Sequence, residues 1–463
     1  MVLSDKQLRD WREWGWPIVE TVNLSVRLPR GPPDEGPWNE VSILDRSSLQ
    51  KIHQGQNHVT FNCTDFQPHG RRTCPRVEHI TTPAYTPYSA PGFALGRPVF
   101  VNYATLSDLS VFQNASDLCS GKVVALVRHG RTSYGNKLRH IVEFCEMMAD
   151  GTLPGGMVGY KDPTESAPPD GSVYPEGIGI PGDGIAFRSA SMSKDGGDVE
   201  TPGLPSIDGV YKIENLWEKA LTPIPVQPIS FDDAKIIMNS MAGKPVPEEW
   251  KPCSPKFLGP EGDSLIQLKV RNRVDKEPST LVNVVGAMPG RGPEAHQYVT
   301  LGNHRDAWVQ GASDPHSGTA VLQGVAYLLG LAYQQGWRPR RTIVIASWDA
   351  EEVGLVGSTE FTELYREELV SRAVVYLNQD CPVKGNATFV PRADEFLEAA
   401  LLASAKAARG PCDAGVSLLD FWRKHRKEVE EEAVTLPVGG STDHVPFQYK
   451  LGIPSTYPEF RPV

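Results

Sequence analysis

The chain is expected to adopt an α/β fold in which helices flank a mixed, mainly parallel sheet. Apolar strand-like runs alternate with helix-like segments between residues 279 and 380, a pattern typical of parallel strands joined by crossover helices. Residues 44–278 instead carry short alternating strands among many Pro and Gly residues, which indicates a β-rich insertion. With 463 residues, the chain exceeds the size of one hydrophobic core, so more than one domain is expected.

The N-terminal segment holds a helix-like stretch followed by an alternating strand at 18–27. Within the insertion, the run 122–130 (KVVALVRHG) is strand-like and opens a candidate α/β unit at 122–135. The apolar run 281–288 (LVNVVGAM) indicates that the main sheet resumes there. The expected segments are the N-terminal part of the α/β domain, the insertion and the rest of the α/β domain, with bounds 1–43, 44–278 and 279–463.

Three further strands are expected at Tyr298–Leu301, Thr342–Ser347 and Ala373–Leu377. Helix-like segments, Gly318–Ala332 and Gly357–Val370, lie between them. This order of strand, helix, strand, helix and strand predicts three parallel strands. In such sheets, functional residues collect beyond the carboxyl ends of the strands.

Residue types that bind metals follow each of these three strands. The segments are GNHRDAW (302–308), ASDPHSG (312–318), SWDAEEVG (347–354) and LNQD (377–380). They supply His304, Asp314, Glu351, Glu352 and Asp380. Each residue alone has an ordinary structural interpretation, but their joint occurrence at strand ends favours a common site.

Zinc binds imidazole nitrogen and carboxylate oxygen, and catalytic zinc keeps one position open for water. A pair of zinc ions about 3.5–4 Å apart needs a shared carboxylate, and a free carboxylate must then take a proton from the water. The adjacent Glu351 and Glu352 suit this division, one as base and the other as ligand. Asp306, two residues after His304, is placed to orient the imidazole.

At these residues the chain resembles the glutamate carboxypeptidase II and transferrin receptor family of zinc peptidases (N-acetylated alpha-linked acidic dipeptidase-like). The matching stretches are GNHRDAWVQGASDPHSGTAVL, GWRPRRTIVIASWDAEEVGLVGSTEF and VVYLNQD. The resemblance implies a zinc exopeptidase fold that hydrolyses peptides with two zinc ions, and it identifies 44–278 as an inserted protease-associated (apical) domain.

The resemblance also implies a role for each residue of the site. His304, Glu352 and Asp380 would be terminal ligands, Asp314 the bridging carboxylate and Glu351 the general base. The bond between Asp314 and Pro315 could be cis, because X-Pro bonds tolerate that isomer. The family's fifth ligand is a later His in a Tyr-rich segment. The two His residues after Asp380, His425 in a charged helix-like run and His444 in a loop, are not expected to replace it.

A calcium ion is implied by resemblance alone. The matching positions are Thr201, the backbone carbonyl of Leu204, Glu360 and Glu363. Mixed carboxylate and backbone oxygens suit calcium. The alternative interpretation is a helix with exposed Glu residues.

Family members that prefer terminal glutamate hold its carboxylates with Arg and Asn side chains, a task for which bidentate Arg is well suited. The corresponding positions here are Tyr134, Gly179, Val390, Tyr457 and Glu459. Glutamate-terminated peptides are therefore not expected as preferred substrates. Two alternatives remain. One is a carboxypeptidase or aminopeptidase whose pocket does not select glutamate, and the other is a catalytically inactive, transferrin receptor-like binding protein. The intact metal-binding residues favour the enzyme.

The net charge of −10 argues against a nucleic-acid partner. No run reaches the roughly 18 apolar residues of a spanning helix. The resemblance implies that the chain is truncated at both ends. Family members begin with a cytoplasmic tail and one membrane anchor. They are single-pass type II proteins that face the extracellular space or the secretory lumen. They form homodimers through a helical domain that comes later in the chain. Glycosylation sequons agree with that route and occur at Asn23, Asn62, Asn114 and Asn386.

Seven cysteines form no C-x-x-C pair and are odd in number, so no disulfide framework is predicted. Cys381 directly follows Asp380. It is expected to be a buried small residue rather than a nucleophile.

Overall fold

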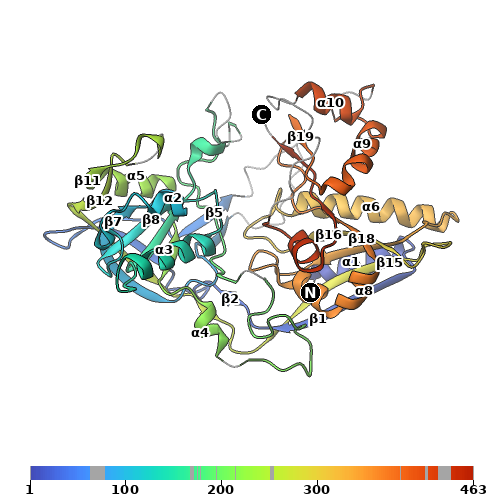
Figure 1. Ribbon diagram of the computed structural model, residues 1–463, viewed down its shortest axis with the longest axis horizontal. Coiled ribbons are helices and arrows are strands. Elements are labelled where there is room, and N and C mark those ends of the chain that lie inside the picture. Colours follow the sequence, from blue (N-terminus) through green and yellow to red (C-terminus); the bar gives the residue numbers. More distant parts are fainter. Residues whose placement is uncertain are drawn as a thin grey trace. The chain divides into compact units, whose positions relative to one another are not determined.

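The computed structural model contains two compact units (Figure 1). Unit 1 comprises Met1–Arg27, Lys194–Glu214 and Glu277–Val463, and unit 2 comprises Leu28–Ser193 and Asn215–Lys276. The structure describes residues 2–62, 79–166, 171–174, 176–177, 179–193, 196–213, 215–250, 255–385, 387–411, 415–425 and 440–461.

These units differ from the segments expected from composition. Residues 28–43 belong to unit 2, because the strand Glu40–Asp45 pairs with Ser264–Val270 in that unit. Residues 194–214 return to unit 1, where the backbone amides of Asp198 and Ser206 donate to the buried Glu360. A composition break could reveal neither contact, since both join residues far apart in the sequence.

Unit 1 is built on a six-stranded sheet with the order β1-β15-β17-β16-β18-β20. The bounds are β1 Ile18–Val26, β15 Ser279–Met288, β17 Thr342–Trp348, β16 Tyr298–His304, β18 Ala373–Asn378 and β20 Ser455–Thr456. The pairs β1/β15 and β15/β17 are antiparallel, whereas β17/β16, β16/β18 and β18/β20 are parallel. The expected mixed sheet and its three central parallel strands are thus confirmed.

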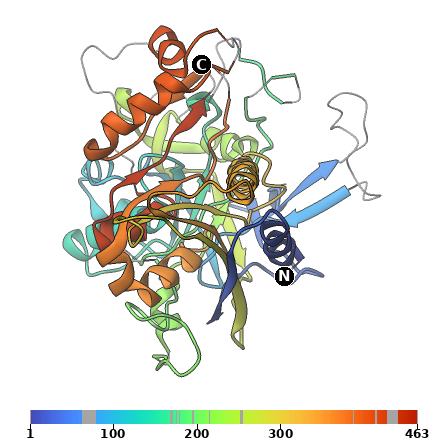
Figure 2. The same cartoon turned by 90° about the vertical axis from the view of Figure 1, so that its right-hand side faces the viewer.

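Helices cover the sheet of unit 1 on both faces. On one face, α1 (Val2–Glu13) and α6 (His316–Gln334), seen end-on in Figure 2, bury a core that includes Trp11, Leu322 and Ile345. Trp348 is three residues beyond Ile345 on β17, so its side chain points to the opposite face. There its ring lies 4.9 Å from that of Phe361 in α7 (Val356–Leu364).

The helix expected over Gly357–Val370 is in fact two helices, α7 and α8 (Arg366–Arg372). They separate at Tyr365, whose backbone leaves the helical region at φ −106° while its ring packs on Phe361. No Pro or Gly marks this break, which is why the sequence pattern predicted one helix.

Unit 2 is built on a seven-stranded sheet with the order β10-β9-β8-β7-β13-β3-β4. The bounds are β10 Val226–Pro228, β9 Gly156–Tyr160, β8 Val123–Arg128, β7 Gly92–Phe100, β13 Ser264–Val270, β3 Glu40–Asp45 and β4 Lys51–Gln54. The first four strands are parallel and the rest antiparallel. All six residues of β8 are buried, as expected for a strand with a core on each face.

A disulfide joins Cys119 and Cys145 within unit 2. Cys145 lies on α3 (Tyr134–Met148), the helix that follows β8 in the α/β unit expected at 122–135. The sequence did not predict this pairing, because the two cysteines are brought together only by the packing of α3 on the sheet.

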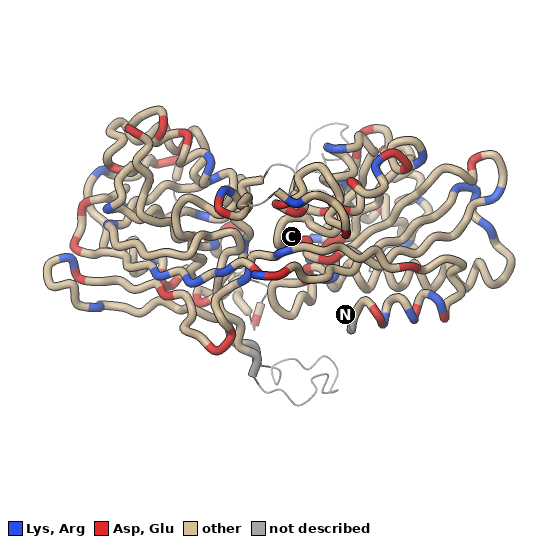
Figure 3. The backbone as a smooth tube through the Cα atoms, turned by 90° about the horizontal axis from the view of Figure 1, so that it is seen from below, with Lys and Arg blue, Asp and Glu red and all other residues tan. Residues whose placement is uncertain are grey.

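Shorter elements complete the described chain. The strands are β2 Pro29–Arg30, β5 His58–Asn62, β6 His79–Pro83, β11 Met241–Pro245, β12 Phe257–Gly262, β14 Arg273–Val274, β19 Thr388–Val390 and β21 Glu459–Arg461. The helices are α2 Leu106–Leu109, α4 Leu216–Ala220, α5 Phe231–Asn239, α9 Glu398–Ala407 and α10 Leu418–His425. Acidic and basic residues are interspersed along the backbone (Figure 3). Among the helices that the structure describes, none is long and apolar enough to cross a bilayer.

Candidate metal centre

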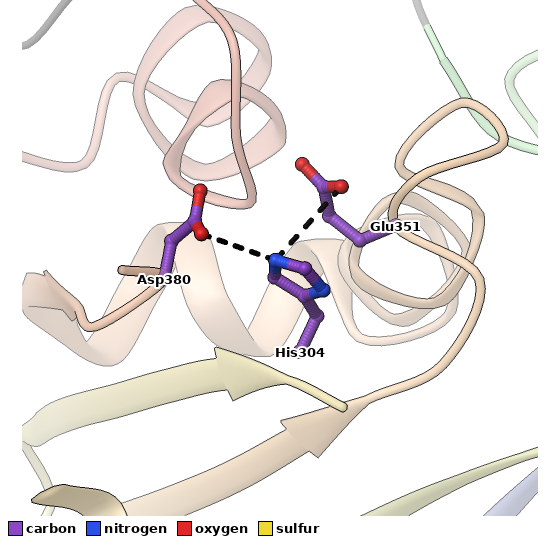
Figure 4. Close-up of side chains that lie close together, drawn as sticks. All are labelled: His304, Glu351 and Asp380. Carbon is purple, nitrogen blue, oxygen red and sulfur yellow. Dashed lines mark hydrogen bonds and ion pairs between the residues drawn. The ribbon is translucent and has the colours of Figure 1, made fainter. Parts of the chain in front are cut away.

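The predicted site residues lie beyond the carboxyl ends of three adjacent parallel strands of unit 1. His304 is the last residue of β16, the central strand of the three. Glu351 and Glu352 follow β17, and Asp380 follows β18. Neighbouring parallel strands end at the same edge of a sheet, and the side chains of His304, Glu351 and Asp380 converge there (Figure 4).

The imidazole of His304 is buried at the centre of this group. Its Nε2 atom lies 3.2 Å from Asp380 Oδ1, 3.5 Å from Asp314 Oδ1 and 4.0 Å from Glu351 Oε2. A tetrahedral zinc ion with bonds of about 2.0–2.2 Å holds its donor atoms about 3.3–3.6 Å apart. The distances from His304 Nε2 to Asp380 and to Asp314 are therefore each close to the spacing of two ligands on one ion.

Asp306 connects the imidazole to the acidic pair. The Nδ1 atom of His304 lies 3.1 Å from the backbone oxygen of Asp306 and 3.5 Å from its Oδ1. The two oxygens of the Asp306 carboxylate accept the backbone N–H groups of Glu351, at 3.0 Å, and Glu352, at 3.1 Å. One side chain therefore fixes the loop that carries both glutamates and lies against the imidazole. That Asp306 orients His304 stays a prediction.

A second group of donors adjoins the first. One oxygen each of Asp314 and Asp380 and the thiol sulfur of Cys381 lie within 4.8 Å of one another, and Asp380 also belongs to the group with His304 and Glu351. The Asp314 side chain is 51% exposed, so this group is open on one side. The peptide bond between Asp314 and Pro315 is cis.

The electrostatics of the site call for cations. Burial raises the pKa of Glu351 well above its usual value, and it raises that of Glu352 to about 9, with further repulsion from Asp314. Burial opposes a charged imidazole, but the surrounding carboxylates, led by Glu351, outweigh it and raise the pKa of His304. One buried oxygen of Glu352 has no hydrogen-bond partner among the described residues. A bound metal cation would offset the cost of burying so many carboxylates together. The residues of this site therefore fit such a cation.

The sequence analysis missed Asp443. Its side chain is fully buried, burial raises its pKa to about 7, and its charge affects Glu351. It lies in the segment between residues 440 and 445 rather than at a strand end of the parallel core. No strand-end pattern could therefore identify it.

The two later histidines are placed differently. His444 is buried, with its ring 6.3 Å from that of Tyr457. His425 ends α10, where its Nδ1 atom contacts the backbone oxygen of Phe421. Neither belongs to the donor groups found among the described residues.

The residues expected to bind calcium lie in unit 1. The carboxylate of Glu360 is buried and accepts the N–H groups of Asp198 and Ser206, both at 2.6 Å. Glu363 pairs with Lys450 at 2.9 Å. The hydroxyl of Thr201 is buried without a hydrogen-bond partner in the described part, whereas Leu204 is exposed.

Two of the glycosylation sequons lie at exposed positions, Asn23 on the edge strand β1 and Asn114 before a short turn of helix. The Asn62 side chain and Asn386 lie outside the described residues.

The described positions that replace the glutamate-binding residues lie in both units. Tyr134, in unit 2, is buried with its hydroxyl bonded to His129. In unit 1, the carboxylate of Glu459 is fully buried and is bonded to Lys384, Arg392 and Arg461. A carboxylate of the protein itself thus engages the three cations at this position.

The chain is similar in sequence to known peptidases. Residues 283–462 match the model of peptidase family M28. The chain is 32% identical over 426 residues to Aminopeptidase NAALADL1 of Rattus norvegicus, covering 87% of this chain and 54% of that protein. It is 33% identical over 392 residues to a glutamate carboxypeptidase 2 homolog of Caenorhabditis elegans, covering 79% of this chain and 48% of that protein. The chain thus spans about half the length of these curated relatives.

A zinc aminopeptidase from Bacillus subtilis, BSAP, has a similar fold, with a TM-score of 0.51 and 16% sequence identity. The similarity covers 99% of this chain and 78% of the BSAP chain. An aminopeptidase from Aneurinibacillus sp. strain AM-1 has the same TM-score of 0.51, at 14% identity.

Proposed function

Because residues 283–462 match the model of peptidase family M28, we propose that this chain carries the catalytic centre of a zinc-dependent exopeptidase. The observation that carries the proposal is the distance of His304 Nε2 from an oxygen of Asp380 and from one of Asp314, since each suits two ligands of a zinc ion. The adjoining donor group that includes Asp314 and Asp380 supports a second ion, and the charge of Asp314 acts on Glu352. In this assignment His304, Glu352 and Asp380 are terminal ligands and Asp314 is shared between the ions.

Zinc held by these donors would polarise the scissile carbonyl and lower the pKa of a water molecule toward neutrality. Glu351 accepts the proton of the attacking water and passes it to the leaving amine. Burial raises the pKa of Glu351, which suits a group that must both accept and donate a proton near neutral pH. Asp306 holds the backbone of Glu351 in place while it does so.

The roles of the two glutamates need an experimental decision. Glu351 belongs to a donor group with His304 and Asp380, a position that would also suit a ligand. Glu352, in contrast, lies near Asp314, which is the strongest charge acting on its pKa. The metal contents of single variants separate the two roles, since only loss of a ligand lowers them.

The proposed substrates are peptides without a terminal-glutamate preference. The support is Glu459, a buried carboxylate at one of the expected glutamate-binding positions, which engages Lys384, Arg392 and Arg461. The relatives include an aminopeptidase and a glutamate carboxypeptidase 2 homolog by name, so amino- and carboxypeptidase activity both need testing. The intact donor set argues against the inactive, transferrin receptor-like alternative.

The test is to incubate the purified chain with amino-acid anilides and dipeptides, with zinc and with a chelator. Zinc-dependent cleavage that is lost with the chelator and in the Glu351→Gln variant would support the proposal. A chain that binds zinc but cleaves neither substrate class would favour the binding protein. Selective cleavage of glutamate-terminated peptides would refute the argument from Glu459.

We propose two further assignments in line with the resemblance. Unit 2, a β-rich insertion between parts of unit 1, would be a protease-associated domain. Thr201, Leu204, Glu360 and Glu363 would bind calcium, since burial raises the pKa of Glu360 to about 8 and a nearby cation would offset that cost. Calcium should then raise the melting temperature of the wild type but not of Glu363→Gln.

A further inference from the structure

A network of buried hydrogen bonds adjoins the proposed metal centre and has no role in the proposed mechanism. Its members are four fully buried side chains of unit 1, Trp348, Tyr376, Asn378 and Thr442. Trp348 Nε1 donates to the Tyr376 hydroxyl at 2.8 Å, and this hydroxyl donates to Asn378 Oδ1 at 3.2 Å. Asn378 Nδ2 in turn donates to the hydroxyl oxygen of Thr442 at 3.2 Å. This buried network thus joins β17 and β18 to the segment that carries Thr442.

The direction of these bonds is fixed by the groups at both ends. The indole nitrogen of Trp348 can only donate, so the Tyr376 hydroxyl must accept from it and keeps its own proton for Asn378. The hydroxyl oxygen of Thr442 accepts from Asn378 and, at 2.7 Å, from the backbone N–H of Asp443. Both acceptor positions of that oxygen are therefore occupied, and the O–H group of Thr442 is left to donate.

That remaining donor acts on the proposed ligand Asp380. Burial opposes the charge on Asp380, but hydrogen bonds from His304 and Thr442 help to outweigh burial and lower its pKa to about 2. Every bond of the buried network therefore runs from donor to acceptor toward the Asp380 carboxylate. Hydrogen bonds in such a series polarise one another, so each bond strengthens the next.

We propose that Tyr376 is a positioning residue for Asp380 and acts on it through Asn378 and Thr442. This inference rests on the proposed zinc centre, to which Asp380 contributes a ligand. Loss of the Tyr376 hydroxyl would leave the indole N–H of Trp348 and the Oδ1 atom of Asn378 buried without a partner. The Asn378 amide would then be free to turn, and the Thr442 hydroxyl would lose the donor that directs it at Asp380.

The backbone leaves room for this network at Gly302, two residues before His304 on β16. A Cβ atom at position 302 would lie 2.2 Å from the Tyr376 hydroxyl oxygen and 2.6 Å from Trp348 Nε1. Glycine is therefore required for the two side chains to meet beside β16. The ring of Phe447 stacks on that of Tyr376 at a centroid distance of 4.0 Å, so removal of the hydroxyl alone should leave the Tyr376 ring in place.

The competing explanation is that the buried network only stabilises the fold. The test compares Tyr376→Phe, which keeps the stacked ring, with Thr442→Val, which keeps the shape of threonine but has no hydroxyl. Zinc affinity, measured by competition with a chromophoric chelator, should fall about 10–100-fold in each variant, the usual range for groups that orient metal ligands. The matched control is Tyr298→Phe, because the Tyr298 hydroxyl lies at the other end of β16 and bonds to Glu368 and Arg372. This control should bind zinc as tightly as the wild type.

The double variant separates the two explanations. If Tyr376 acts through Thr442, then Tyr376→Phe should cause no further loss of zinc affinity once Thr442→Val is present, whereas two independent effects would multiply. Wild-type zinc affinity in Tyr376→Phe, or losses that multiply in the double variant, would overturn the inference and leave the peptidase proposal intact. A wild-type chain that binds no zinc would overturn both. A chain that shows the expected zinc affinities but cleaves no peptide would overturn the peptidase proposal alone.

A second measurement needs no variant. Because coupling between zinc and the buried network is reciprocal, zinc should slow hydrogen exchange of the Trp348 indole N–H in the wild type. The buried indole N–H of Trp11, which donates to Gln323 at 2.8 Å, reports general stabilisation of unit 1. NMR should show a greater slowing at Trp348 than at Trp11, and equal slowing at both would overturn the inference.

Discussion

Replacement of Asp306 by Asn should weaken zinc binding without removing any proposed ligand. The Asp306 carboxylate accepts two backbone N–H groups, at 3.0 and 3.1 Å, and lies beside the imidazole of His304. Burial favours its neutral form, but His304 and the two amides outweigh burial and lower its pKa, so it is ionised. Asn keeps one acceptor oxygen and turns an NH2 group toward the other backbone N–H.

The expected loss follows from that geometry. One hydrogen bond to a charged acceptor disappears and a buried N–H is left without a partner, which costs about 1.5–3 kcal/mol. If this cost destabilises the loop conformation that binds zinc, the zinc affinity drops about 10–100-fold, since about 1.4 kcal/mol corresponds to a factor of ten. This agrees with the usual effect of groups that orient metal ligands.

The assay is competition for zinc against a chromophoric chelator, with Asp349→Asn as the matched control. Asp349 is also an aspartate after β17, but its carboxylate pairs with Arg305 and lies 3.3 Å from the backbone N–H of Val282. Asp349→Asn should lower the melting temperature but leave the zinc affinity within about threefold of wild type, because the substitution removes no contact to the proposed metal ligands. An Asp306→Asn variant that binds zinc as tightly as the wild type would show that the Asp306 carboxylate does not support zinc binding.

Glu351→Gln should retain zinc and lose several orders of magnitude in kcat, whereas Glu352→Gln should lower metal content; equal metal loss by elemental analysis would contradict these roles. The chelated chain should become less stable as pH rises from about 5 to about 8. Glu352, with an ordinary pKa of 4.5 raised to about 9, and His304, also raised, hold protons in the folded state that the unfolded chain releases across this window. Thermal melts with and without zinc test this prediction. A chelated chain that is more stable at pH 8 than at pH 5 would contradict it. Glu459→Gln should lower the free energy of unfolding by about 2–3 kcal/mol, because it removes the buried carboxylate that pairs with three cations. Urea unfolding measures this loss, and the exposed control Glu395→Gln should show little change.

The sequence predicted those parts of the protein that depend on local pattern. The strands that end at His304, Trp348 and Asn378 were expected within three residues of their observed ends, since buried parallel strands are continuous apolar runs. The meeting of His304 and Asp380 followed from the parallel order alone. The proximity of Asp306 to the imidazole follows from its position two residues after His304.

Features that depend on contacts between distant segments could not be predicted in this way. Asp443 reaches the site from a segment with no strand-end signal, and the disulfide between Cys119 and Cys145 depends on how α3 packs. The return of residues 194–214 to unit 1 depends on Glu360, which binds backbone amides from that segment. In each case the partner lies far away in sequence and leaves no periodic pattern.

The most direct test of the zinc centre is anomalous diffraction at the zinc absorption edge, using crystals of this chain grown with zinc. A peak is expected about 2.0–2.2 Å from His304 Nε2 and from a carboxylate oxygen of Asp380, and this peak should be lost in Asp380→Ala crystals. Absence of a peak beside His304 in wild-type crystals, or zinc bound only elsewhere, would contradict it.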